Sequence, residues 1–488
     1  MKLKIILISK ILLLFLVCNS MCAQVDGTLD TSFNSNGTGF SGGTHYWVNT
    51  LALQADGKIL AGGGNFISYN GQSRDKIARL NSDGSLDVTF DSMVFAQGEN
   101  GIINAIVVQP DGKILIGGVK TKTQTTEGFF MRLNSDGSID SSFTNNAILY
   151  SESVNSIALQ NDGKILVGGY FYQSPNVFEG YLKRLNIDGT IDSSFTIGAG
   201  GPDFNTSIST IALQPDGKIL IGGNFENYHN LRQNKWILRL NSNGTIDWSF
   251  NIGTGFNNTV SKIVVQSDGK ILVGGRFTEY NGQQTTKCLT RLNSNGSLDT
   301  SFNNSNSVGQ IGDYVGSIIL QLDGKIIIGG SFGTFNGQSQ NRIARLNSDG
   351  TLDSSLDIGS GFLRHPNPSG SFVYAVGLQA DGKVLVGGNF TEYNKQPQSR
   401  ITRLNNINTL SIEKNQSEKI IIYPNPVNDF LYLDKEVQKI TLKDLSGKII
   451  NVNTDVSKID MSNFSPGIYF IDIEQKNASK ETHKVIKK

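Results

Sequence analysis

One stretch of ten residues, QADGKILAGG at 54–63, returns along the chain with small changes. Its DGK triplet begins at Asp56, Asp111, Asp162, Asp216, Asp268, Asp323 and Asp381. Two further markers, RLN and LDxSF or a close variant, also occur seven times each and keep the same order. The step between DGK triplets is 51 to 58 residues. A period of this size is typical of repeat architectures, in which each unit buries its apolar surface against its neighbours.

Each repeat divides into four short strands. In the segment VNSIALQ at 154–160, large and small residues alternate as in a strand with two apolar faces of different bulk. An Asp-Gly pair follows, which predicts a two-residue type I′ turn with positive φ at both positions. The next strand, KILVGG, ends in Gly168 and Gly169, which permit a bulge or a close approach of another backbone. Segments such as KIARLN (76–81) and SLDVTF (85–90) supply the third and fourth strands of an antiparallel meander.

A four-stranded sheet with two apolar faces has to be covered by copies of itself, and the radial solution is a β-propeller. Seven repeats predict seven blades. The array opens with a fourth strand, DGTLDTSF at 26–33, and stops after a third strand, TRLNN at 402–406. We therefore expect the segment 29–33 to complete the seventh blade and to close the ring. An open solenoid is the alternative, but it needs capping units, which the array lacks at both ends.

Residues 1–23 have the layout of a secretory signal peptide. A basic start is followed by an apolar run from 5 to 17 and by small residues that lead to Ala23. Cleavage after Ala23 would make Gln24 the first residue of the mature chain. A membrane anchor is the alternative, but the run is shorter than the roughly 20 apolar residues that span a bilayer. Bulky residues before the two early cysteines disfavour a lipoprotein.

Composition excludes several classes of function. The 43 Lys and Arg residues and the 42 Asp and Glu residues give a formal net charge of +1, without the basic excess of proteins that bind nucleic acid or of polybasic membrane patches. Cys288 is the one cysteine beyond residue 23, so the mature chain forms no internal disulfide. We therefore expect a protein stabilised by a large core, without a transmembrane span and without a nucleic-acid partner.

The markers LDxSF, LQxDGKIlxGG and RLNxDG in series resemble the delta-60 repeat, a β-propeller domain of unknown function. The resemblance covers roughly residues 26–405, and it implies a propeller without an established activity. The second repeat departs from the pattern with GGVKTKTQTTEGFF, where other repeats carry an aromatic residue after the glycines. Residues 24–405 are thus predicted to form an all-β, seven-bladed propeller of four-stranded antiparallel blades.

A different domain follows Asn406, where the repeats stop. Residues 406–419 are polar and indicate a linker, and alternating apolar residues between turn signals in 420–488 predict a small β-sandwich. Its motifs are YPNP (Tyr423, Pro424, Asn425 and Pro426), DLSGK with Gly447, and SPGIYF with Pro466, Gly467 and Tyr469. Together they resemble the C-terminal sorting domain of the type IX secretion system of Bacteroidota. That resemblance implies Sec export, passage across the outer membrane by the type IX machinery, removal of the domain, and release or anchoring to lipopolysaccharide. An ordinary accessory binding domain is the alternative.

The Arg of RLN and the Asp of LDxSF recur once per repeat. A carboxylate beside an apolar strand needs a partner, so we predict one Arg–Asp pair, or an Asp bonded to backbone amides, in every blade. The Asp or Asn of the SDG and SNG turns could be a calcium ligand, but a turn residue that bonds its own backbone is favoured. His45, His229, His365 and His483 are scattered without metal-ligand spacing. Cys288 is expected to be a structural thiol.

The sequence lacks a G-x-S-x-G elbow, a P-loop and an H-E-x-x-H helix. We assign no catalytic, cofactor or metal residue. Function on a symmetric scaffold is expected in loops that break the symmetry, here 41–47, 172–181, 226–236 and 361–370. These loops combine Tyr, Trp, His, Arg and Asn, a mixture suited to sugars or protein surfaces.

Three functions compete. The leading hypothesis is a secreted or surface-displayed propeller that is not an enzyme and acts as a binding or adhesion module for polysaccharide or protein. The second is a carbohydrate hydrolase or lyase, for which Asp203 and Glu226 are loose candidate carboxylates. The third is a structural surface protein without a small ligand. Paired acids in the asymmetric loops would favour the enzyme, and ligand-dependent stabilisation would exclude the purely structural role.

Overall fold

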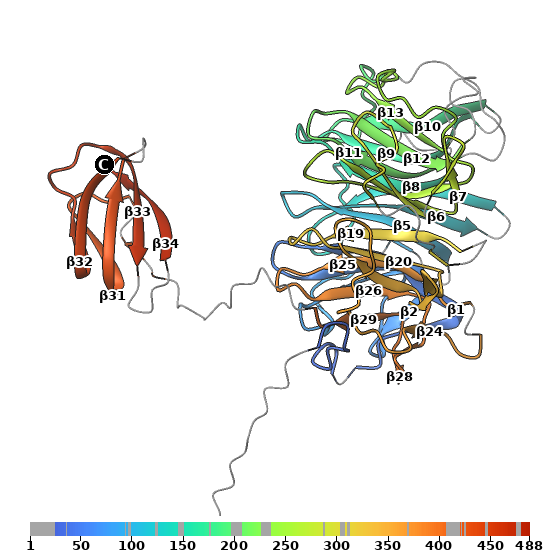
Figure 1. The fold of residues 1–488 in the computed structure, drawn as a ribbon, viewed down its shortest axis with the longest axis horizontal. Helices are drawn as coiled ribbons and strands as arrows, with labels where there is room; N and C mark the ends of the chain where they lie inside the picture. Colours follow the sequence, from blue (N-terminus) through green and yellow to red (C-terminus); the bar gives the residue numbers. More distant parts are fainter. Residues whose placement is uncertain are drawn as a thin grey trace, which may run out of the picture. The chain divides into compact units, whose positions relative to one another are not determined.

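The computed structural model describes residues 25–35, 37–92, 94–95, 99–122, 125–144, 151–174, 177–196, 207–225, 236–285, 288–302, 308–309, 313–367, 370–406, 420, 422–423, 426–444, 448–474 and 480–488. The chain divides into two compact units, 1–410 and 411–488 (Figure 1). The predicted signal segment 1–23 and its cleavage site at Ala23 and Gln24 lie outside the described residues, as does most of the predicted linker 406–419. Within the described part, no helix has the length and hydropathy needed to cross a membrane.

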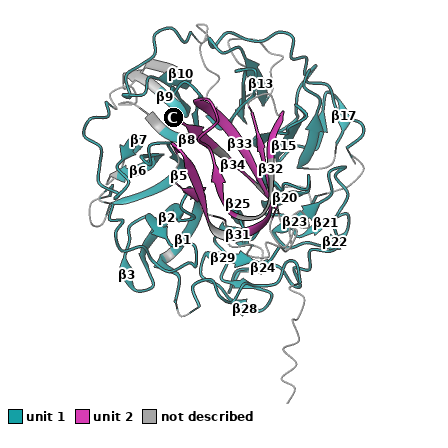
Figure 2. Ribbon diagram, turned by 90° about the vertical axis from the view of Figure 1, so that its left-hand side faces the viewer, with its two compact units in different colours: residues 1–410 teal, residues 411–488 magenta. Residues whose placement is uncertain are grey.

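Unit 1 is a ring of seven blades, each with three hydrogen-bonded antiparallel strands (Figure 2). The first strands are β1 (Phe40–Leu53), β5 (Asn100–Val108), β8 (Ser151–Leu159), β11 (Ser207–Leu213), β14 (Val260–Val265), β19 (Val315–Leu320) and β25 (Val373–Leu378). The second strands are β2 (Ile59–Tyr69), β6 (Ile114–Lys122), β9 (Ile165–Ser174), β12 (Ile219–Asn224), β15 (Ile271–Gly275), β20 (Ile326–Gly330) and β26 (Val384–Gly388). The third strands are β4 (Ile77–Leu80), β7 (Thr125–Leu133), β10 (Val177–Leu185), β13 (Ile237–Leu240), β18 (Leu289–Leu292), β23 (Ile343–Leu346) and β29 (Ile401–Leu404). First strands of successive blades contact one another around the ring, and β25 contacts β1. The predicted seven-bladed, all-β propeller is confirmed.

Short strands extend the connections between the second and third strands. They are β3 (Gln72–Ser73), β16 (Glu279–Tyr280), β17 (Gln283–Gln284), β21 (Thr334–Phe335), β22 (Gln338–Ser339), β27 (Glu392–Tyr393) and β28 (Gln396–Pro397). Another short strand, β24 (Phe362–Leu363), lies between the sixth and seventh blades, before β25. Three segments predicted as loops are partly strand. The segment 172–181, apart from 175–176, falls on β9 and β10. Residues 41–47 belong to β1, and the start of 361–370 forms β24, which pairs with β27.

The fourth strand of each blade is shorter than the sequence predicts. It is reduced to one bridging residue, with the pairs Leu80–Leu86, Leu133–Ile139, Leu185–Ile191, Leu240–Ile246, Leu292–Leu298, Leu346–Leu352 and Leu404–Leu29. The Asp that follows ends the strand. In the first blade, Asp87 Oδ1 accepts hydrogen bonds from the amide and the hydroxyl of Thr89 at 2.9 and 2.6 Å. Such a local side-chain turn competes with strand pairing.

The hairpin between the first and second strands also differs from the prediction. In the third blade, Gly163 N donates to Gln160 O at 3.0 Å, and Gln160 N donates to Lys164 O at 2.8 Å. Three residues thus lie between the paired ends, and of these Gly163 alone has a positive φ, 83°. This is a type I turn followed by a left-handed glycine. The predicted type I′ turn is wrong because the loop has three residues rather than two.

Both ends of the propeller sequence meet in the seventh blade. Leu29 bridges Leu404, Asp30 N donates to Arg403 O at 2.9 Å, and Asn405 N donates to Thr28 O at 2.8 Å. The segment predicted to complete this blade does so, and the ring is closed by strand pairing between residues that are far apart in sequence.

Unit 2 is a small all-β domain, as predicted for the C-terminal domain, and its five strands are linked in one hydrogen-bonded sheet. Its strands are β30 (Ile422–Tyr423), β31 (Phe430–Lys443), β32 (Ile449–Asp460), β33 (Gly467–Glu474) and β34 (Lys480–Lys487). The long β31 pairs with β30, β32 and β33, and its register with β32 shifts between Tyr432 and Val437. Buried Val427, Ile440 and Ile471 belong to one apolar cluster.

Candidate functional site

The second glycine of each GG pair allows one residue of the first strand to project towards the centre of the ring. In the third blade, Val154 pairs with Gly169 and Ser156 with Gly168, so the residue between them is skipped as a bulge. A Cβ on Gly169 would lie 2.0 Å from Ser153 O, so a glycine is required there. The same skip occurs in every blade, at Asn49, Asn104, Asn155, Ser209, Ser261, Gly316 and Tyr374.

The first glycine of each pair packs directly against a side chain of the next blade. A Cβ on Gly168 would lie 2.8 Å from Ile208 Cγ2 of the fourth blade. Across the closure, a Cβ on Gly387 would lie 2.7 Å from Val48 Cγ1 of the first blade. The bulge and close approach that the sequence predicts for the glycines are both confirmed, and the pair links blade packing to the shape of the ring centre.

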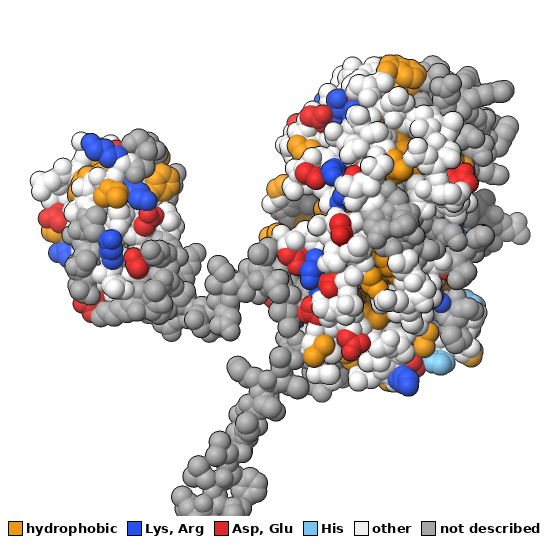
Figure 3. Space-filling view, viewed as in Figure 1, with side chains coloured by type: hydrophobic (Ala, Val, Ile, Leu, Met, Phe, Trp, Pro, Cys, Tyr) orange, Lys and Arg blue, Asp and Glu red, His pale blue; other side chains and the backbone are white. Residues whose placement is uncertain are grey.

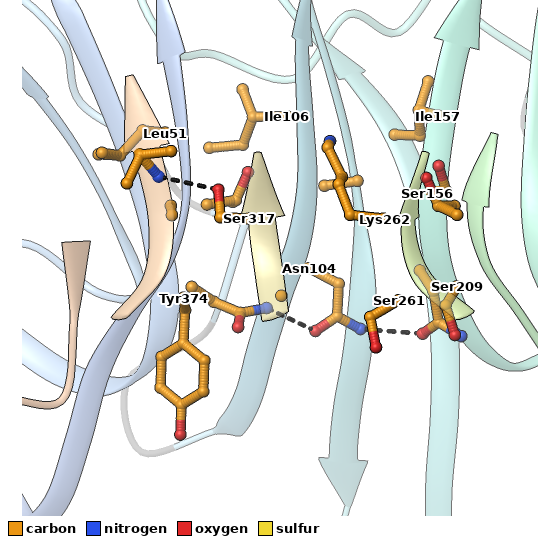
Figure 4. A pocket seen from close by; sticks show the side chains of 18 of the residues that line it. Leu51, Asn104, Ile106, Ser156, Ile157, Ser209, Ser261, Lys262, Ser317 and Tyr374 are labelled. Carbon is orange, nitrogen blue, oxygen red and sulfur yellow. Dashed lines mark hydrogen bonds between the residues drawn. The ribbon is translucent and has the colours of Figure 1, made fainter. Parts of the chain in front are cut away.

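The seven bulged residues line a channel in the centre of the ring that encloses about 550 Å³ (Figure 4). The residue after each bulge also lines it. Small-molecule sites usually enclose about 300–1,000 Å³ and combine apolar walls with a few placed polar groups. The channel is therefore the candidate functional site.

Three carboxamides form a ladder on one side of the channel. Asn49 Nδ2 donates to Asn104 Oδ1 at 3.1 Å, and Asn104 Nδ2 donates to Asn155 Oδ1 at 3.3 Å. The same amide groups reach carbonyl oxygens of the next first strand, Val154 O at 3.1 Å and Ile208 O at 3.2 Å. The ladder thus covers part of the inner strand edges, which would otherwise present unpaired backbone groups.

A second layer, at the residue after each bulge, holds four hydroxyl side chains, two alanines and, in the fifth blade, one lysine. Ser156 Oγ accepts a hydrogen bond from Ile211 N at 3.1 Å, and Ser317 Oγ accepts one from Val376 N at 3.0 Å, so these hydroxyls join neighbouring blades. The equivalent residue of the fifth blade is Lys262, which pairs opposite Gly274. Lys262 is partly buried and makes no hydrogen bond or ion pair with any residue that the structure describes. Desolvation by the channel walls lowers the pKa of its amine.

Two tyrosines complete the channel lining on the sixth and seventh blades. Tyr374 stacks on Phe372 with ring centroids 5.6 Å apart. Arg276 lies over the Tyr314 ring at 4.7 Å. Burial raises the pKa of Tyr374 to about 12 and also raises that of Tyr314, so both phenols stay neutral at ordinary pH. Each tyrosine offers an aromatic surface and a hydroxyl.

The predicted Arg–Asp pair is present in all seven blades. The guanidinium Nε and the carboxylate Oδ2 are 2.7 Å apart in Arg79–Asp87, Arg132–Asp140, Arg184–Asp192, Arg239–Asp247, Arg291–Asp299, Arg345–Asp353 and Arg403–Asp30. The Lys of DGK joins each pair, as Lys113 Nζ does with Asp140 Oδ2 at 2.7 Å. Burial acts to raise the pKa of Asp140, but the bonds from Lys113, Ser142 and Arg132 outweigh burial and hold it far below its usual range.

Each arginine also reaches the following blade, which the sequence did not predict. Arg132 Nη1 donates to Ile187 O of the third blade at 2.7 Å, and Arg403 Nη1 donates to Ser82 O of the first blade at 2.5 Å. The Arg132 guanidinium lies over Phe143 of LDxSF at 4.4 Å. These groups form a structural ring. Lysine and arginine lie beside acidic side chains on the visible side of unit 1 (Figure 3).

The turn aspartates are engaged by their own backbone. Asp83 Oδ1 accepts hydrogen bonds from Ser85 N at 2.9 Å and Ser85 Oγ at 2.7 Å. Among the described residues, no group of three or more His, Cys, Asp or Glu side chains could hold a metal ion. The turn interpretation therefore accounts for these side chains.

The other candidates are dispersed. His45 is exposed, His365 Nε2 lies 2.9 Å from Glu392 Oε2, and His483 lies in β34. Cys288 is buried, with Sγ 3.1 Å from Asp313 O, which agrees with a structural thiol. His229, Asp203, Glu226 and most of the loop 226–236 lie outside the described residues, as do residues 175–176 of the loop 172–181.

Sequence reasoning missed the channel residues, although the sequence carries a signal for them. Each bulged residue stands five positions before the Gln of QxDGK, as Asn49 does before Gln54 and Tyr374 before Gln379. The polar side chains at this position vary from repeat to repeat within an otherwise regular strand, and Lys262 follows it directly.

The described residues of the sorting-domain motifs lie on the strands of unit 2 or close to their ends. Tyr423 is 51% exposed and stacks on Tyr432, with centroids 5.9 Å apart. Tyr469 is buried, and its hydroxyl donates to Ser465 O at 2.8 Å. Gly467 opens β33 directly after Pro466, and Pro426 precedes buried Val427. Pro424, Asn425 and Gly447 lie outside the described residues.

Solved structures with a similar fold include PorZ, a surface component of the type IX secretion system of Porphyromonas gingivalis. It is 10% identical, with 90% of this chain and 65% of that chain covered and a TM-score of 0.38. Another is the extracellular domain of a hybrid two-component system of B. thetaiotaomicron, at 13% identity, 95% and 59% coverage and a TM-score of 0.45. The chain spans about three fifths of the length of these two structures. A search of curated proteins gave no match.

Two family descriptions match the sequence. The description "Domain of unknown function (DUF5122) beta-propeller" matches 54–90, 109–143, 160–195, 214–250, 266–302, 321–356 and 379–408, which together exceed half of the chain. The description "Secretion system C-terminal sorting domain" matches 421–488. The chain belongs to the DUF5122 β-propeller family and ends in a type IX secretion sorting domain.

Proposed function

We propose that this protein is a binding or adhesion module whose polysaccharide or protein ligand occupies the central channel of the propeller. The observation that carries the proposal is the loss of sevenfold regularity at the bulge. The ion pairs, glycines and hairpin turns repeat in every blade, whereas the bulged position holds three Asn, two Ser, one Gly and one Tyr. Structure requires the bulge in each blade, but it does not require this set of polar and aromatic side chains.

The proposal assigns binding rather than catalysis. Among the described residues that line the channel, none carries a carboxylate, an imidazole or a thiol. Most glycosidases use two carboxyl groups, about 5 to 9.5 Å apart. The candidate carboxylates Asp203 and Glu226 lie outside the described residues. The described chemistry of the channel, which consists of amides, hydroxyls, aromatic rings and one amine, supports recognition of a ligand.

The sorting domain indicates the compartment in which the propeller encounters its ligand. A type IX sorting domain directs export to the cell surface or into the medium. We infer that the type IX machinery is the partner of unit 2 and that unit 1 acts outside the cell, on polysaccharide or on another surface protein.

Thermal unfolding of the purified chain with a panel of polysaccharides and surface-protein fractions tests this proposal. A ligand that binds the folded state stabilises it by about 2.7 kcal/mol at a hundredfold excess over its dissociation constant. Tyr374→Ala should abolish the shift. The matched control, Trp248→Ala, removes an aromatic side chain that is 70% exposed and does not line the channel, and it should retain the shift.

Other outcomes separate the competing functions. A shift that survives Tyr374→Ala would place the ligand outside the channel. Release of shorter sugars from a bound polysaccharide would favour the carbohydrate-active enzyme. No shift with any polysaccharide or protein would favour a purely structural surface role.

A further inference from the structure

Lys262 is the one charged side chain among the described residues that line the channel. It occupies a position where Ser156, Thr210 and Ser317 use hydroxyls to accept backbone hydrogen bonds from the next blade. Lysine can only donate, so it cannot serve that structural role. Its amine is instead left without a partner among the described residues, and burying a charge without a counter-charge is unfavourable.

Among the residues that the structure describes, the surroundings of Lys262 supply no counter-ion. Strands β11, β12, β15 and β19, which pack against β14, contain no charged residue. Tyr314 stands just before β19, and Arg276 lies over its ring as a second cation. The carboxylate of Asp313, the residue before Tyr314, acts on Arg342, whereas desolvation alone shifts the pKa of Lys262. An anionic ligand is therefore the missing complement of this part of the channel.

The opposite side of the channel offers hydrogen-bond acceptors. Blades follow one another in sequence order around the ring, so the fifth blade faces the first and second blades, which carry Asn49 and Asn104. Asn49 starts the carboxamide ladder as a donor through Nδ2, and its Oδ1 accepts no hydrogen bond from the described residues. Ser209 and Ser261 place hydroxyls on the wall between the ladder and Lys262 (Figure 4).

Two aromatic rings favour a sugar over a peptide as the anion carrier. Tyr314 and Tyr374 line adjacent parts of the channel wall, and each is partly buried. A pyranose ring has an apolar face that packs on an aromatic ring and hydroxyls that bond amides and hydroxyls on the other walls. An acidic peptide would need apolar pockets for alternate side chains or a sheet edge for strand addition, and the ladder covers part of that edge.

We propose that the central channel binds an acidic saccharide, with its carboxylate paired to Lys262, its ring against Tyr374, and its hydroxyls bonded to the asparagine ladder. This inference rests on the proposed binding function and adds the chemical class of the ligand. The ligand carries a uronic acid residue, and the shared chemistry of such sugars is one carboxylate per ring.

The test uses the full purified chain and isothermal titration with trigalacturonate, trimannuronate and a hyaluronan tetrasaccharide. Each sugar is compared with its carboxyl-reduced form, which keeps the ring and replaces the carboxylate by an alcohol. We expect at least one acid to bind about 10- to 100-fold more tightly than its reduced form, the range of one charged hydrogen bond. Lys262→Met should remove this preference, and Lys262→Arg should retain most of it.

The pH dependence gives a second readout. The carboxylate pairs with the protonated amine, so affinity should fall as the pH rises through the pKa of Lys262. The other titratable groups that line the described channel, Tyr314 and Tyr374, have raised pKa values and stay neutral over that range. The reduced sugars and Lys262→Met should show no such alkaline loss.

Several outcomes would overturn the inference. They are equal binding of the acid and reduced forms, an acid preference that persists in Lys262→Met, absence of binding by all three acids, or tighter binding of pentaglutamate than of the sugars. Binding of a neutral glycan that depends on Tyr374 would refute the acidic ligand and leave the proposed binding function standing. If no glycan and no protein binds, both fail.

Discussion

Replacing Asp30 with asparagine keeps the shape of the side chain and removes the charge that joins the start of the propeller to its seventh blade. Asp30 Oδ2 accepts hydrogen bonds from Arg403 Nε at 2.7 Å and from Lys383 Nζ at 2.8 Å. Its Oδ1 accepts bonds from Ser32 N at 3.0 Å and Ser32 Oγ at 2.6 Å. Removing one partner of a buried pair costs about 3–5 kcal/mol, because the other charge remains buried. We expect Asp30→Asn to lower the free energy of unfolding towards the lower end of that range, since asparagine keeps an acceptor oxygen.

The matched control is Asp192→Asn, whose carboxylate bonds Arg184 at 2.7 Å and Lys164 at 2.8 Å inside one continuous repeat. Urea denaturation at pH 7, followed by tryptophan fluorescence, should give similar losses for the two variants. Under native conditions, a protease should cut within residues 25–33 in Asp30→Asn and spare them in Asp192→Asn, since local opening exposes only a segment whose anchor is weakened. A loss below about 1 kcal/mol, the net worth of an ordinary hydrogen bond, or equal cutting of the two variants would refute this reasoning.

Gly169→Ala should unfold at a clearly lower temperature, because its Cβ would lie 2.0 Å from Ser153 O, whereas Gly43→Ala, with open space around the added atom, should melt as the wild type does. Burial alone would raise the pKa of each LDxSF aspartate, but the hydrogen bonds to its carboxylate outweigh burial. The pKa of each aspartate therefore lies below its unfolded value. The stability from these pairs is thus complete at neutral pH and should fall as the pH drops below about 5, which urea unfolding at several pH values would detect. Calcium or a chelator should leave the melting temperature unchanged, and a calcium-dependent rise would contradict the turn interpretation. The Cys288 thiol should react with a thiol reagent after unfolding but not before, because it is buried.

Sequence patterns that occur seven times made three features predictable: the seven blades, the closure of the ring and the Arg–Asp pairs. A single strand-like segment would be compatible with many folds. Seven copies of the same alternation and the same Asp-Gly turn are compatible with few. The unpaired fourth strand at 26–33 then needed a partner, and the seventh repeat lacked one. The pairing of Asp30 with Arg403 followed from those two gaps.

The channel and the exact turn could not be predicted from the same pattern. An Asp-Gly pair fits a two-residue and a three-residue loop, and the register of the strands decides between them. The bulge at Asn104 comes from contact with Gly118 on the next strand, and its direction comes from ring geometry that no single repeat contains. Nothing in the fifth repeat alone marks Lys262, because its position in the ring becomes visible only when the repeats are superposed.

The closure in the seventh blade also determines the order in which the ring can be built. Asp30 and Arg403 are 373 positions apart in the chain, and contacts of such separation form slowly because a long loop has to close first. The segment 26–33 is made first, yet it has no partner strand until residue 404 has been synthesised. Six blades can assemble by local strand pairing while this segment has no partner strand. A chain that stops short of Arg403 would leave both the segment 26–33 and the edge of β26 unpaired. Closure of the ring therefore requires the complete set of repeats.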